Sequence, residues 1–405
     1  MGFLPTSKVS TDEVVIEEIL TRSIASVLPS KEELRILLRQ GKHLRIYLGV
    51  DATGAQLHLG HATNFLLLEK LRMLGHEIII LFGDFTARIG DPTNKEAVRR
   101  QLSMEEVERN ISDWKTQVSK VIRFSGTNPA KILRNSVWLS KLTTNELVDI
   151  AAIFTLQQMV ERDMFENRIK EGKPIYLHEF LYPLLQGYDS VAMDVDVEVG
   201  GSDQTFNMLM GRTLQKKYHH KNKFVIATTL LEDPRTGKKL MSKSEGSYIA
   251  LNDAPSEMFG KTMALPDGVV RQMFIDTTLL PMTEIEAVLQ GHPKDAKMRL
   301  AREIVTLYHD KDAAKKAEEN FSSTFSEGEI PEGIQTIEVE KNTTLFSVLI
   351  EQKLISSRSD FSRLLQQGAI KDLSTGEKLK DHNFIIEREI TLRIGKHRFL
   401  KIMVN

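Results

Sequence analysis

The 405-residue chain contains no cysteine. This absence excludes a disulfide framework, a thiol nucleophile and every metal site that needs a thiolate ligand. No apolar run approaches the ~20 residues that a helix needs to cross a bilayer. The N-terminal residues show no basic region followed by an apolar stretch, so no secretory signal is expected. The default prediction is a cytoplasmic protein.

Positive and negative charges nearly cancel over the whole chain, and the net charge is −1. This balance argues against a general nucleic-acid-binding protein. The distribution is uneven, because residues 341–405 carry 12 Lys and Arg against 7 Asp and Glu, a net charge of +5, and the preceding chain is near −6. The length suffices for two or three domains, of which the C-terminal one is basic.

Three consecutive segments predict a βαβ unit. Residues 44–50 alternate between apolar and other side chains as a strand does, residues 58–73 have helical spacing, and residues 76–82 form an apolar run typical of a buried parallel strand. A βαβ unit indicates a doubly wound, Rossmann-like parallel sheet. Asp91 and Lys95 follow the second strand, at the edge where such sheets bind ligands.

The turn between the first strand and the helix points to an anion. Gly49, Asp51 and Thr53 are small or hydrogen-bonding residues that let a turn approach a ligand. His58 and His61 share one face of the first helical turn, where backbone N–H groups and the helix dipole favour a phosphate chain. Helix capping or a structural metal is the alternative for two such histidines, but no third ligand lies nearby in sequence, and no metal site is expected.

Residues 103 to about 173 read as almost entirely helical, which is too long for a simple crossover. Met159, Met164 and Phe165 in this stretch suit an exposed interface, although an internal core is the commoner use of such residues.

A helix beginning near Leu177 places Tyr182, Gln186 and Asp189 on one face, because they are spaced i, i+4 and i+7. A phenol, an amide and a carboxylate in otherwise apolar surroundings form a candidate binding site. From spacing alone, Asp189 is equally suited to capping the helix or pairing with a surface lysine.

Further along, residues 194–199 alternate as a strand and lead into Gly201, Asp203 and Gln204. Paired glycines let a ligand touch the backbone, and Asp203 stands where a ribose needs an acceptor.

The C-terminal half divides into three parts. Residues 253–325 are helical, residues 326–340 are acidic and read as a linker, and residues 341–405 combine two short helices with strands. The basic loop before them contains M-S-K-S at residues 241–244 and has no hydrophobic period, so it is expected to be mobile.

Three motifs together resemble one family over nearly the full length. H-L-G-H at 58–61, Y-x-x-x-Q-x-x-D at 182–189 and M-S-K-S at 241–244 are similar to the signatures of class I aminoacyl-tRNA synthetases of the tyrosyl type. Leu240 occupies the first lysine position of the family's K-M-S-K-S signature, and Lys239 lies one residue earlier.

The resemblance implies a domain organisation. It places a Rossmann-like catalytic domain at 1–240 with a helical connective and dimerisation insertion at about 103–175. The K-M-S-K-S-type loop and an α-helical anticodon-binding domain follow at 241–325, then the linker, then a small α+β RNA-binding module of ribosomal-protein type at 341–405.

The resemblance also implies roles for individual residues. Catalytic contacts fall to Thr53, His58, His61 and Lys243. Tyrosine contacts fall to Tyr47, Asp91, Tyr182, Gln186, Asp189 and Gln204. ATP contacts fall to Gly49, Asp51, Lys95, Gly201, Asp203, Met241, Ser242 and Lys243. Contacts to tRNA fall to Arg358, Arg363, Lys396, Arg398 and Lys401.

The implied activity is tyrosine–tRNA ligation with ATP as a substrate, Mg²⁺ on the ATP phosphates, tRNA(Tyr) as the partner and a homodimer as the assembly. A tryptophanyl synthetase or small nucleotidyltransferase is the alternative among enzymes, and the 182–189 motif and the length speak against it. The alternative from another class is a non-catalytic RNA-binding or splicing factor, against which Asp91, Asp203 and Lys243 argue.

Overall fold

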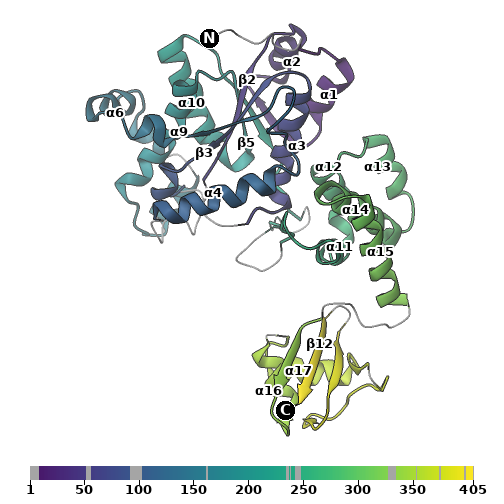
Figure 1. Cartoon of the computed structure of the whole chain (residues 1–405). Coiled ribbons are helices and arrows are strands. Elements are labelled where there is room, and N and C mark those ends of the chain that lie inside the picture. Colours follow the sequence, from purple (N-terminus) through teal and green to yellow (C-terminus); the bar gives the residue numbers. More distant parts are fainter. Residues whose placement is uncertain are drawn as a thin grey trace. The chain divides into compact units, whose positions relative to one another are not determined.

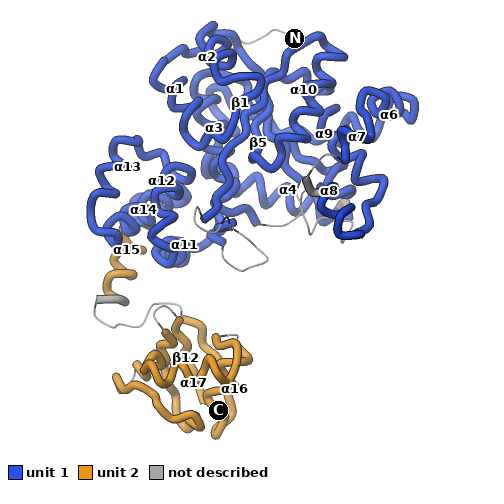
Figure 2. Tube along the Cα trace, turned by 180° about the vertical axis from the view of Figure 1, so that it is seen from behind, with its two compact units in different colours: residues 1–314 blue, residues 315–405 orange. Residues whose placement is uncertain are grey.

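The computed structural model describes residues 9–51, 56–91, 103–160, 163–233, 237, 239–241, 248–326, 334–352, 354–373, 375–395 and 398–404. The chain divides into two compact units, Met1–Ala314 and Lys315–Asn405 (Figure 2). The division falls inside helix α15 (Lys311–Ser326), before the linker expected at 326–340. Among the described helices, none is long and apolar enough to cross a membrane.

A six-stranded sheet forms the centre of the first unit (Figure 1). The strand order is β1-β6-β5-β2-β3-β4, and each neighbouring pair is parallel except β1 with β6. The parallel part confirms the predicted doubly wound sheet. The strands are β1 (Ile24–Leu28), β2 (Arg45–Val50), β3 (Glu77–Phe82), β4 (Lys131–Arg134), β5 (Val197–Gly201) and β6 (Phe224–Thr228).

Two strands, β1 and β4, were not predicted. They are five and four residues long, and runs this short show no period that separates a strand from its helical neighbours. The stretch from residue 103, expected to be almost entirely helical, is interrupted by β4, a strand of the central sheet. The helices of this stretch are α4 (Met104–Val118), α5 (Ser136–Leu139), α6 (Thr144–Ala151), α7 (Leu156–Val160) and α8 (Asp163–Lys170).

Helices cover both faces of the sheet (Figure 1). Val225 and Ala227 of β6 pack against Met208 of α10 (Thr205–His219), which lies beside α9 (Leu177–Met193). The hydroxyl of Thr228 donates instead to Asn64 Oδ1 of α3 (Leu59–Met73) at 2.7 Å. Because side chains alternate along a strand, α3 and α10 lie on opposite faces. Two N-terminal helices, α1 (Glu13–Thr21) and α2 (Lys31–Arg39), complete this part, and α1 packs against α3.

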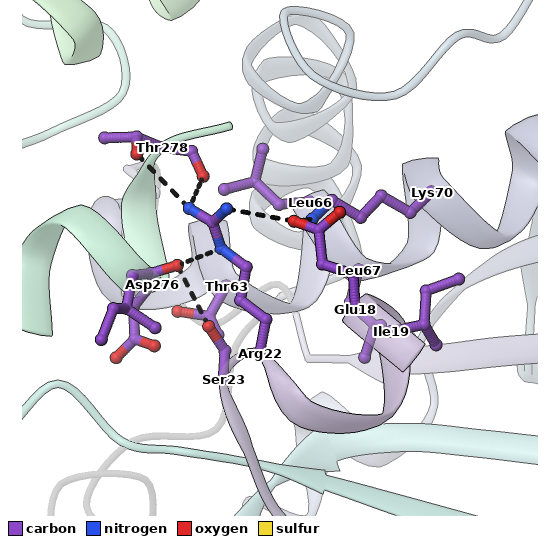
Figure 3. A pocket seen from close by; sticks show the side chains of 11 residues that line it. Glu18, Ile19, Arg22, Ser23, Thr63, Leu66, Leu67, Lys70, Asp276 and Thr278 are labelled. Atoms are coloured by element: carbon purple, nitrogen blue, oxygen red, sulfur yellow. Dashed lines mark hydrogen bonds and ion pairs between the residues drawn. The ribbon is translucent and has the colours of Figure 1, made fainter. Parts of the chain in front are cut away.

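Arg22 anchors the helical part of the first unit to helix α1. Its guanidinium pairs with Glu18 at 3.1 Å and donates to four carbonyls at the C-terminal end of α12, those of Phe274, Ile275, Thr278 and Leu280. A cation there is favoured by the helix dipole and satisfies carbonyls that lack helical partners. Glu18, Arg22 and Thr278 line a small pocket together with Lys70 (Figure 3). The helices concerned are α11 (Pro255–Met263), α12 (Val270–Thr277), α13 (Met282–Leu289) and α14 (Pro293–Tyr308).

The second unit is built on a four-stranded sheet with the order β7-β12-β11-β9. Strand β7 runs parallel to β12, so residues 336–339 belong to this sheet and not to the linker expected there. Its core is apolar and includes Leu349, Phe361 and Ile402. The elements are β7 (Thr336–Val339), β8 (Thr343–Thr344), α16 (Leu345–Glu351), α17 (Arg358–Gln366), β9 (Ile370–Asp372), β10 (Ile385–Ile386), β11 (Ile390–Ile394) and β12 (Arg398–Val404).

The apolar residues expected at an interface are mostly internal. Met159 is buried in a core cluster, and Phe165 is fully buried with its ring 4.7 Å from that of Phe180. The side chain of Met164 is outside the described part. Other apolar residues of this stretch are exposed instead, namely Val148, Leu156, Ile169, Tyr176 and Leu177. Helical periodicity alone did not distinguish the buried from the exposed apolar residues, because these helices are short.

Candidate active site

The two histidines of H-L-G-H cap helix α3. His58 is the N-cap, and its Nδ1 accepts a hydrogen bond from the backbone N–H of Gly60 at 3.2 Å. His61 Nδ1 lies 3.2 Å from the backbone nitrogen of His58, which donates to it, and the two rings are 4.1 Å apart. An accepting Nδ1 carries no proton, so the neutral His58 imidazole holds its proton on Nε2. His61 Nδ1 also lies 3.3 Å from the carbonyl oxygen of His58. Capping therefore prepares His58 as an Nε2–H donor at the positive end of a helix, with the His61 ring beside it.

The start of the M-S-K-S segment lies against this helix end. A Cβ on Gly60 would be 2.9 Å from the His58 ring and 3.4 Å from Cβ of Met241, so only glycine fits. On the far side of the loop, the Leu59 N–H donates to the carbonyl of Ile249 at 3.0 Å. Met241 thus lies beside Gly60 of the H-L-G-H segment. Thr53, Lys95, Ser242 and Lys243, with Lys396 of the second unit, lie outside the described residues.

The predicted face of α9 carries a chain of polar contacts. Tyr182 donates to Asp51 Oδ2 at 2.9 Å, and Gln186 donates to Glu198 Oε1 at 3.1 Å. Asp189 is 3% exposed, and its two carboxylate oxygens accept from Trp138 Nε1 at 2.7 Å and from Asn135 Nδ2 at 3.2 Å. The middle turns of α9 therefore carry Tyr182, Gln186 and Asp189 on the face that contacts the sheet and the segments after its strands. Asp189 neither caps the helix nor pairs with a surface lysine.

Tyr47 of β2 completes the inner end of this site. It is fully buried, and its hydroxyl lies 2.9 Å from Ser190 Oγ. Burial, together with the charges of Glu198 and Asp189, raises the pKa of Tyr47 well above its ordinary value. Its phenol therefore stays protonated and available as a hydrogen-bond donor.

Asp51 lies at the carboxyl end of β2, and its pKa is raised above the ordinary value. It accepts from Thr86 Oγ1 at 2.8 Å and from Tyr182. Desolvation, reinforced by the charges of Asp91 and Asp84, raises the pKa of Asp51 to about 7 although these two hydrogen bonds oppose the change. A Cβ on Gly83 would lie 2.0 Å from Asp51 Oδ1, so glycine at 83 makes room for this carboxylate.

Asp91 and Gln204 meet across the site. Gln204 Nε2 donates to Asp91 Oδ2 at 2.6 Å, and Asn207 Nδ2 bridges the amide oxygens of Gln204 and Gln186, each at 3.0 Å. This network joins the loop after β3, the start of α10 and the face of α9. Three of the six residues predicted to hold tyrosine, Asp91, Gln204 and Gln186, are therefore linked by a side-chain contact or through Asn207 alone.

The residues predicted to hold the nucleoside lie at two strand ends. Gly49 is exposed at the end of β2, and Gly201 ends β5. Asp203 is exposed and forms an ion pair with Lys239 at 3.3 Å. Lys239, displaced by one residue from the family's lysine position, thus reaches the predicted ribose acceptor.

Several polar residues of the site were not predicted. Asn135 and Trp138 follow β4, which was itself missed; the buried Thr86 follows β3. Glu198 sits in the alternating D-V-D-V-E-V run that predicted a strand; β5 is an internal strand, and Glu198 is 1% exposed. For Asn135, Trp138 and Thr86 the signal is their place after the carboxyl ends of strands, and it required the strands to be known.

The predicted tRNA-binding residues lie in the second unit on α17 and β12. Each described one has an intramolecular partner: Arg358 over the ring of Phe346 at 5.5 Å, Arg363 with Asp360 at 2.6 Å, Lys401 with Glu389 at 2.6 Å, and Arg398 with the carbonyl of Leu354.

Comparison with known proteins finds consistent similarity. The family described as class I tRNA synthetases (W and Y) matches residues 39–326. The chain is 43% identical over 404 residues to the tyrosine–tRNA ligase of Carboxydothermus hydrogenoformans, covering 95% of this chain and 97% of that protein. It is 39% identical over 393 residues to the tyrosine–tRNA ligase of Thermotoga maritima, covering 95% and 96%.

Solved structures show the same fold. A C-terminally truncated mitochondrial tyrosyl-tRNA synthetase from Aspergillus nidulans is 25% identical with a TM-score of 0.66, covering 77% of this chain and 94% of that chain. The Archaeoglobus fulgidus tyrosyl-tRNA synthetase, crystallised with L-tyrosine, has a TM-score of 0.57 at 22% identity, covering 75% of this chain and 99% of that chain.

Proposed function

Because the chain belongs to the tyrosyl branch of the class I tRNA synthetases, we infer that it activates tyrosine with ATP and then esterifies tRNA(Tyr). In the first step the tyrosine carboxylate attacks the α-phosphorus of ATP, the bond to the bridging oxygen breaks and pyrophosphate leaves. In the second step a hydroxyl of the 3′-terminal ribose attacks the carbonyl carbon of tyrosyl-adenylate and AMP leaves. Neither step needs a nucleophilic side chain, so the protein acts by positioning and by stabilising charge.

The buried phenol of Tyr47 and the buried carboxyl group of Asp189 are the observation that carries the proposal. Tyr47 offers a phenol donor. Burial raises the pKa of Asp189 well above its ordinary value although its hydrogen bonds from Trp138 and Asn135 oppose the change, and the carboxyl group retains acceptor capacity beyond those two bonds. A tyrosine hydroxyl placed between them would satisfy both. Phenylalanine would leave both unpaired, and rejection by ~10⁴ or more is the magnitude established for tyrosyl-tRNA synthetases, which we adopt here.

The open end of the site suits an ammonium group. Asp91, Tyr182 and Gln186 present a carboxylate, a phenol oxygen and an amide oxygen, with Gln204 and Asp51 in contact with them. These acceptors would hold the α-ammonium and direct the carboxylate of tyrosine toward the histidines of α3.

The ATP phosphates would lie at the N-terminus of α3. The Nε2–H group of His58 and the ring of His61 would contact phosphate oxygens, with Thr53 and Lys243 assigned the remaining contacts by the family resemblance. Gly49, Asp51, Lys95, Gly201 and Asp203 would contact the nucleotide, with Met241 and Ser242 at the loop. Mg²⁺ is proposed as the counter-ion of these phosphates; within the described residues no cluster of three or more metal-ligating side chains occurs.

We extend the proposal to partners and compartment. The second unit would contact tRNA(Tyr) phosphates through Arg358, Arg363, Lys396, Arg398 and Lys401, which makes binding salt-dependent. The exposed apolar residues on α6, α7, α8 and the start of α9 would form the interface of a homodimer. The proposed compartment is the cytoplasm.

The raised pKa of Asp51 predicts a pH dependence of tyrosine binding. Below about pH 7 Asp51 is neutral, and above it the carboxylate is ionised and attracts the ammonium of the ligand. Tyrosine should therefore bind more tightly as the pH rises from 6 to 8, by up to about tenfold per unit below the pKa, with proton release near pH 7. Calorimetric titration in buffers of different ionisation enthalpy measures both quantities.

In the ligand-free protein, a rise in pH has the opposite effect on folding stability to the one it has on tyrosine binding. A carboxyl group whose pKa is raised by folding contributes stability below its unfolded pKa, and that contribution is lost as the pH rises through about 7.

Asp51→Asn should flatten the pH profile of tyrosine binding. Asp276→Asn is the matched control, because Asp276 is also buried with a raised pKa but lies beside Arg22 at α12. A profile unchanged by Asp51→Asn would contradict the assignment.

The first test of the function is ATP–pyrophosphate exchange with each of the twenty amino acids supplied singly, before tRNA is added. We expect exchange with tyrosine and none with phenylalanine. Exchange with tryptophan would assign the chain to the other branch of the family. No exchange with any amino acid would favour a non-catalytic RNA-binding protein.

A further inference from the structure

A buried ion pair lies behind the tyrosine site. Lys223, which directly precedes β6, is fully buried, and its ammonium is hydrogen-bonded to Glu198 Oε2 on the neighbouring strand β5, where Glu198 is 1% exposed. Removing both charges from water costs free energy that their attraction only partly returns. Stability is therefore a weak reason for a lysine and a glutamate at these positions, where two apolar side chains would pack at lower cost.

The pair touches both ends of the proposed tyrosine site. Lys223 Nζ donates to Ser190 Oγ at 2.9 Å, and Ser190 Oγ lies 2.9 Å from the hydroxyl of Tyr47. On the other side, Glu198 Oε1 accepts from Gln186 Nε2 at 3.1 Å. The same ammonium also lies 5.9 Å from the centroid of the Tyr47 ring. One ion pair thus contacts the residues assigned to the substrate hydroxyl and to the substrate ammonium.

The chemistry of lysine gives this chain of contacts a direction. An ammonium donates hydrogen bonds and accepts none, so Ser190 Oγ is the acceptor from Lys223. When the Ser190 hydroxyl in turn donates to the oxygen of Tyr47, the Tyr47 proton is left for another acceptor, and Glu198 also lies within hydrogen-bonding reach of the Tyr47 side chain. In the same way, Glu198 accepts from the amide nitrogen of Gln186 and so turns the amide oxygen of Gln186 away from β5.

We propose that the Lys223–Glu198 pair is a positioning element for tyrosine selection, which orients Tyr47 through Ser190 and the amide of Gln186 directly. This inference rests on the proposed function. Neither charged residue touches the substrate; each acts through a residue that does.

The packing of α10 leaves space for this ammonium. A Cβ on Gly211 would lie 2.4 Å from Lys223 Nζ and 2.5 Å from Ser190 Oγ. Gly187 of α9 is equally constrained, because a Cβ there would be 3.1 Å from the backbone nitrogen of Gly211. The two helices therefore cross on glycines where the Lys223–Ser190 contact is made.

Ser190→Ala tests the contact without leaving a buried charge unpaired, because Lys223 keeps Glu198. We expect kcat/KM for tyrosine in ATP–pyrophosphate exchange to fall about ten- to a hundredfold, mainly through KM, with kcat/KM for phenylalanine unchanged. In the Tyr47→Phe background, Ser190→Ala should have no further effect on the tyrosine to phenylalanine ratio, a non-additivity that a purely structural role would not produce.

Two further variants act on the ion pair itself. Gly211→Ala displaces the ammonium while every hydrogen-bonding group stays present, and the double variant Lys223→Met with Glu198→Gln removes both charges together. Both should lower the tyrosine to phenylalanine ratio. Lys221→Met is the matched control, since Lys221 lies two residues away and pairs with Asp194 and Asp196 outside the site; it should leave the ratio unchanged.

The outcomes separate this inference from the proposed function. A wild-type protein that does not activate tyrosine would overturn the proposed function. A wild-type protein that activates tyrosine, with a ratio unchanged in folded Ser190→Ala and Gly211→Ala or with additive effects of Ser190→Ala and Tyr47→Phe, would overturn the inference alone.

Discussion

Asp189→Asn is expected to reduce kcat/KM for tyrosine activation by about 10³-fold or more while kcat/KM for phenylalanine changes little. The carboxylate of Asp189 accepts from both Trp138 Nε1 and Asn135 Nδ2 in a buried site. An amide at 189 has a single acceptor oxygen and must turn its NH₂ toward one of these two donors. The substrate hydroxyl then loses its acceptor as well, and desolvated donors are left unpaired.

The comparison is made by ATP–pyrophosphate exchange with both amino acids and by chemical unfolding of each variant. Asp194→Asn is the matched control, because Asp194 ends the same helix in the left-handed conformation, is exposed, and is a residue for which asparagine is an accepted substitute. Equal decreases in kcat/KM for tyrosine and phenylalanine would show that Asp189 maintains the fold of the site and does not bind the substrate hydroxyl.

His58→Ala is expected to lower kcat for adenylate formation by about 10²- to 10³-fold without changing the equilibrium affinity for tyrosine. The proposed Nε2–H of His58 donates to a phosphate oxygen whose charge rises as pyrophosphate leaves, so the contact strengthens in the transition state. Rapid-quench measurement of tyrosyl-adenylate, with tyrosine binding measured separately, distinguishes the two effects.

His292→Ala provides a closely matched control. His292 is the N-cap of α14, and its Nδ1 accepts from the backbone N–H of Lys294 at 3.2 Å, which is the geometry of His58 with Gly60. Both variants lose one cap, at a cost of about 1 kcal/mol in stability. If both lowered kcat equally, or neither did, His58 would be a capping residue and not part of the catalytic site.

Where motif residues lie on one regular helix or strand, the sequence predicted which of them lie close to one another. The i, i+4, i+7 spacing of Tyr182, Gln186 and Asp189 determines a common helical face wherever the helix lies, and the structure shows all three making polar side-chain contacts beyond α9. The start of α3 at H-L-G-H and the parallel β2–β3 pair were predicted from local patterns for the same reason. Glycine at 60 is required by a contact within the motif itself, the His58 ring.

Residues whose role depends on a distant partner escaped prediction. Asn135 and Trp138 follow a four-residue strand with no readable period, and they meet Asp189 only because β4 pairs with β3. Met159 and Phe165 suited an interface by sequence, with an internal core as the commoner alternative, and they are buried because their short helices pack against α9 and its neighbours. Burial of this kind depends on which helices pack together, and the sequence of a single helix does not determine its packing partner.

The local features follow from the amino-acid sequence: the βαβ unit, a helix that begins at the two histidines, the polar face of α9 and the family to which these motifs belong. Which buried charges face one another follows from the packing of distant segments. Glu198 on β5 and Lys223, which directly precedes the adjacent parallel strand β6, are 25 residues apart, and Ser190 reaches Lys223 from α9. Their pairing follows from strand order and helix crossing, whereas spacing along the chain determines only contacts within one helix or one turn.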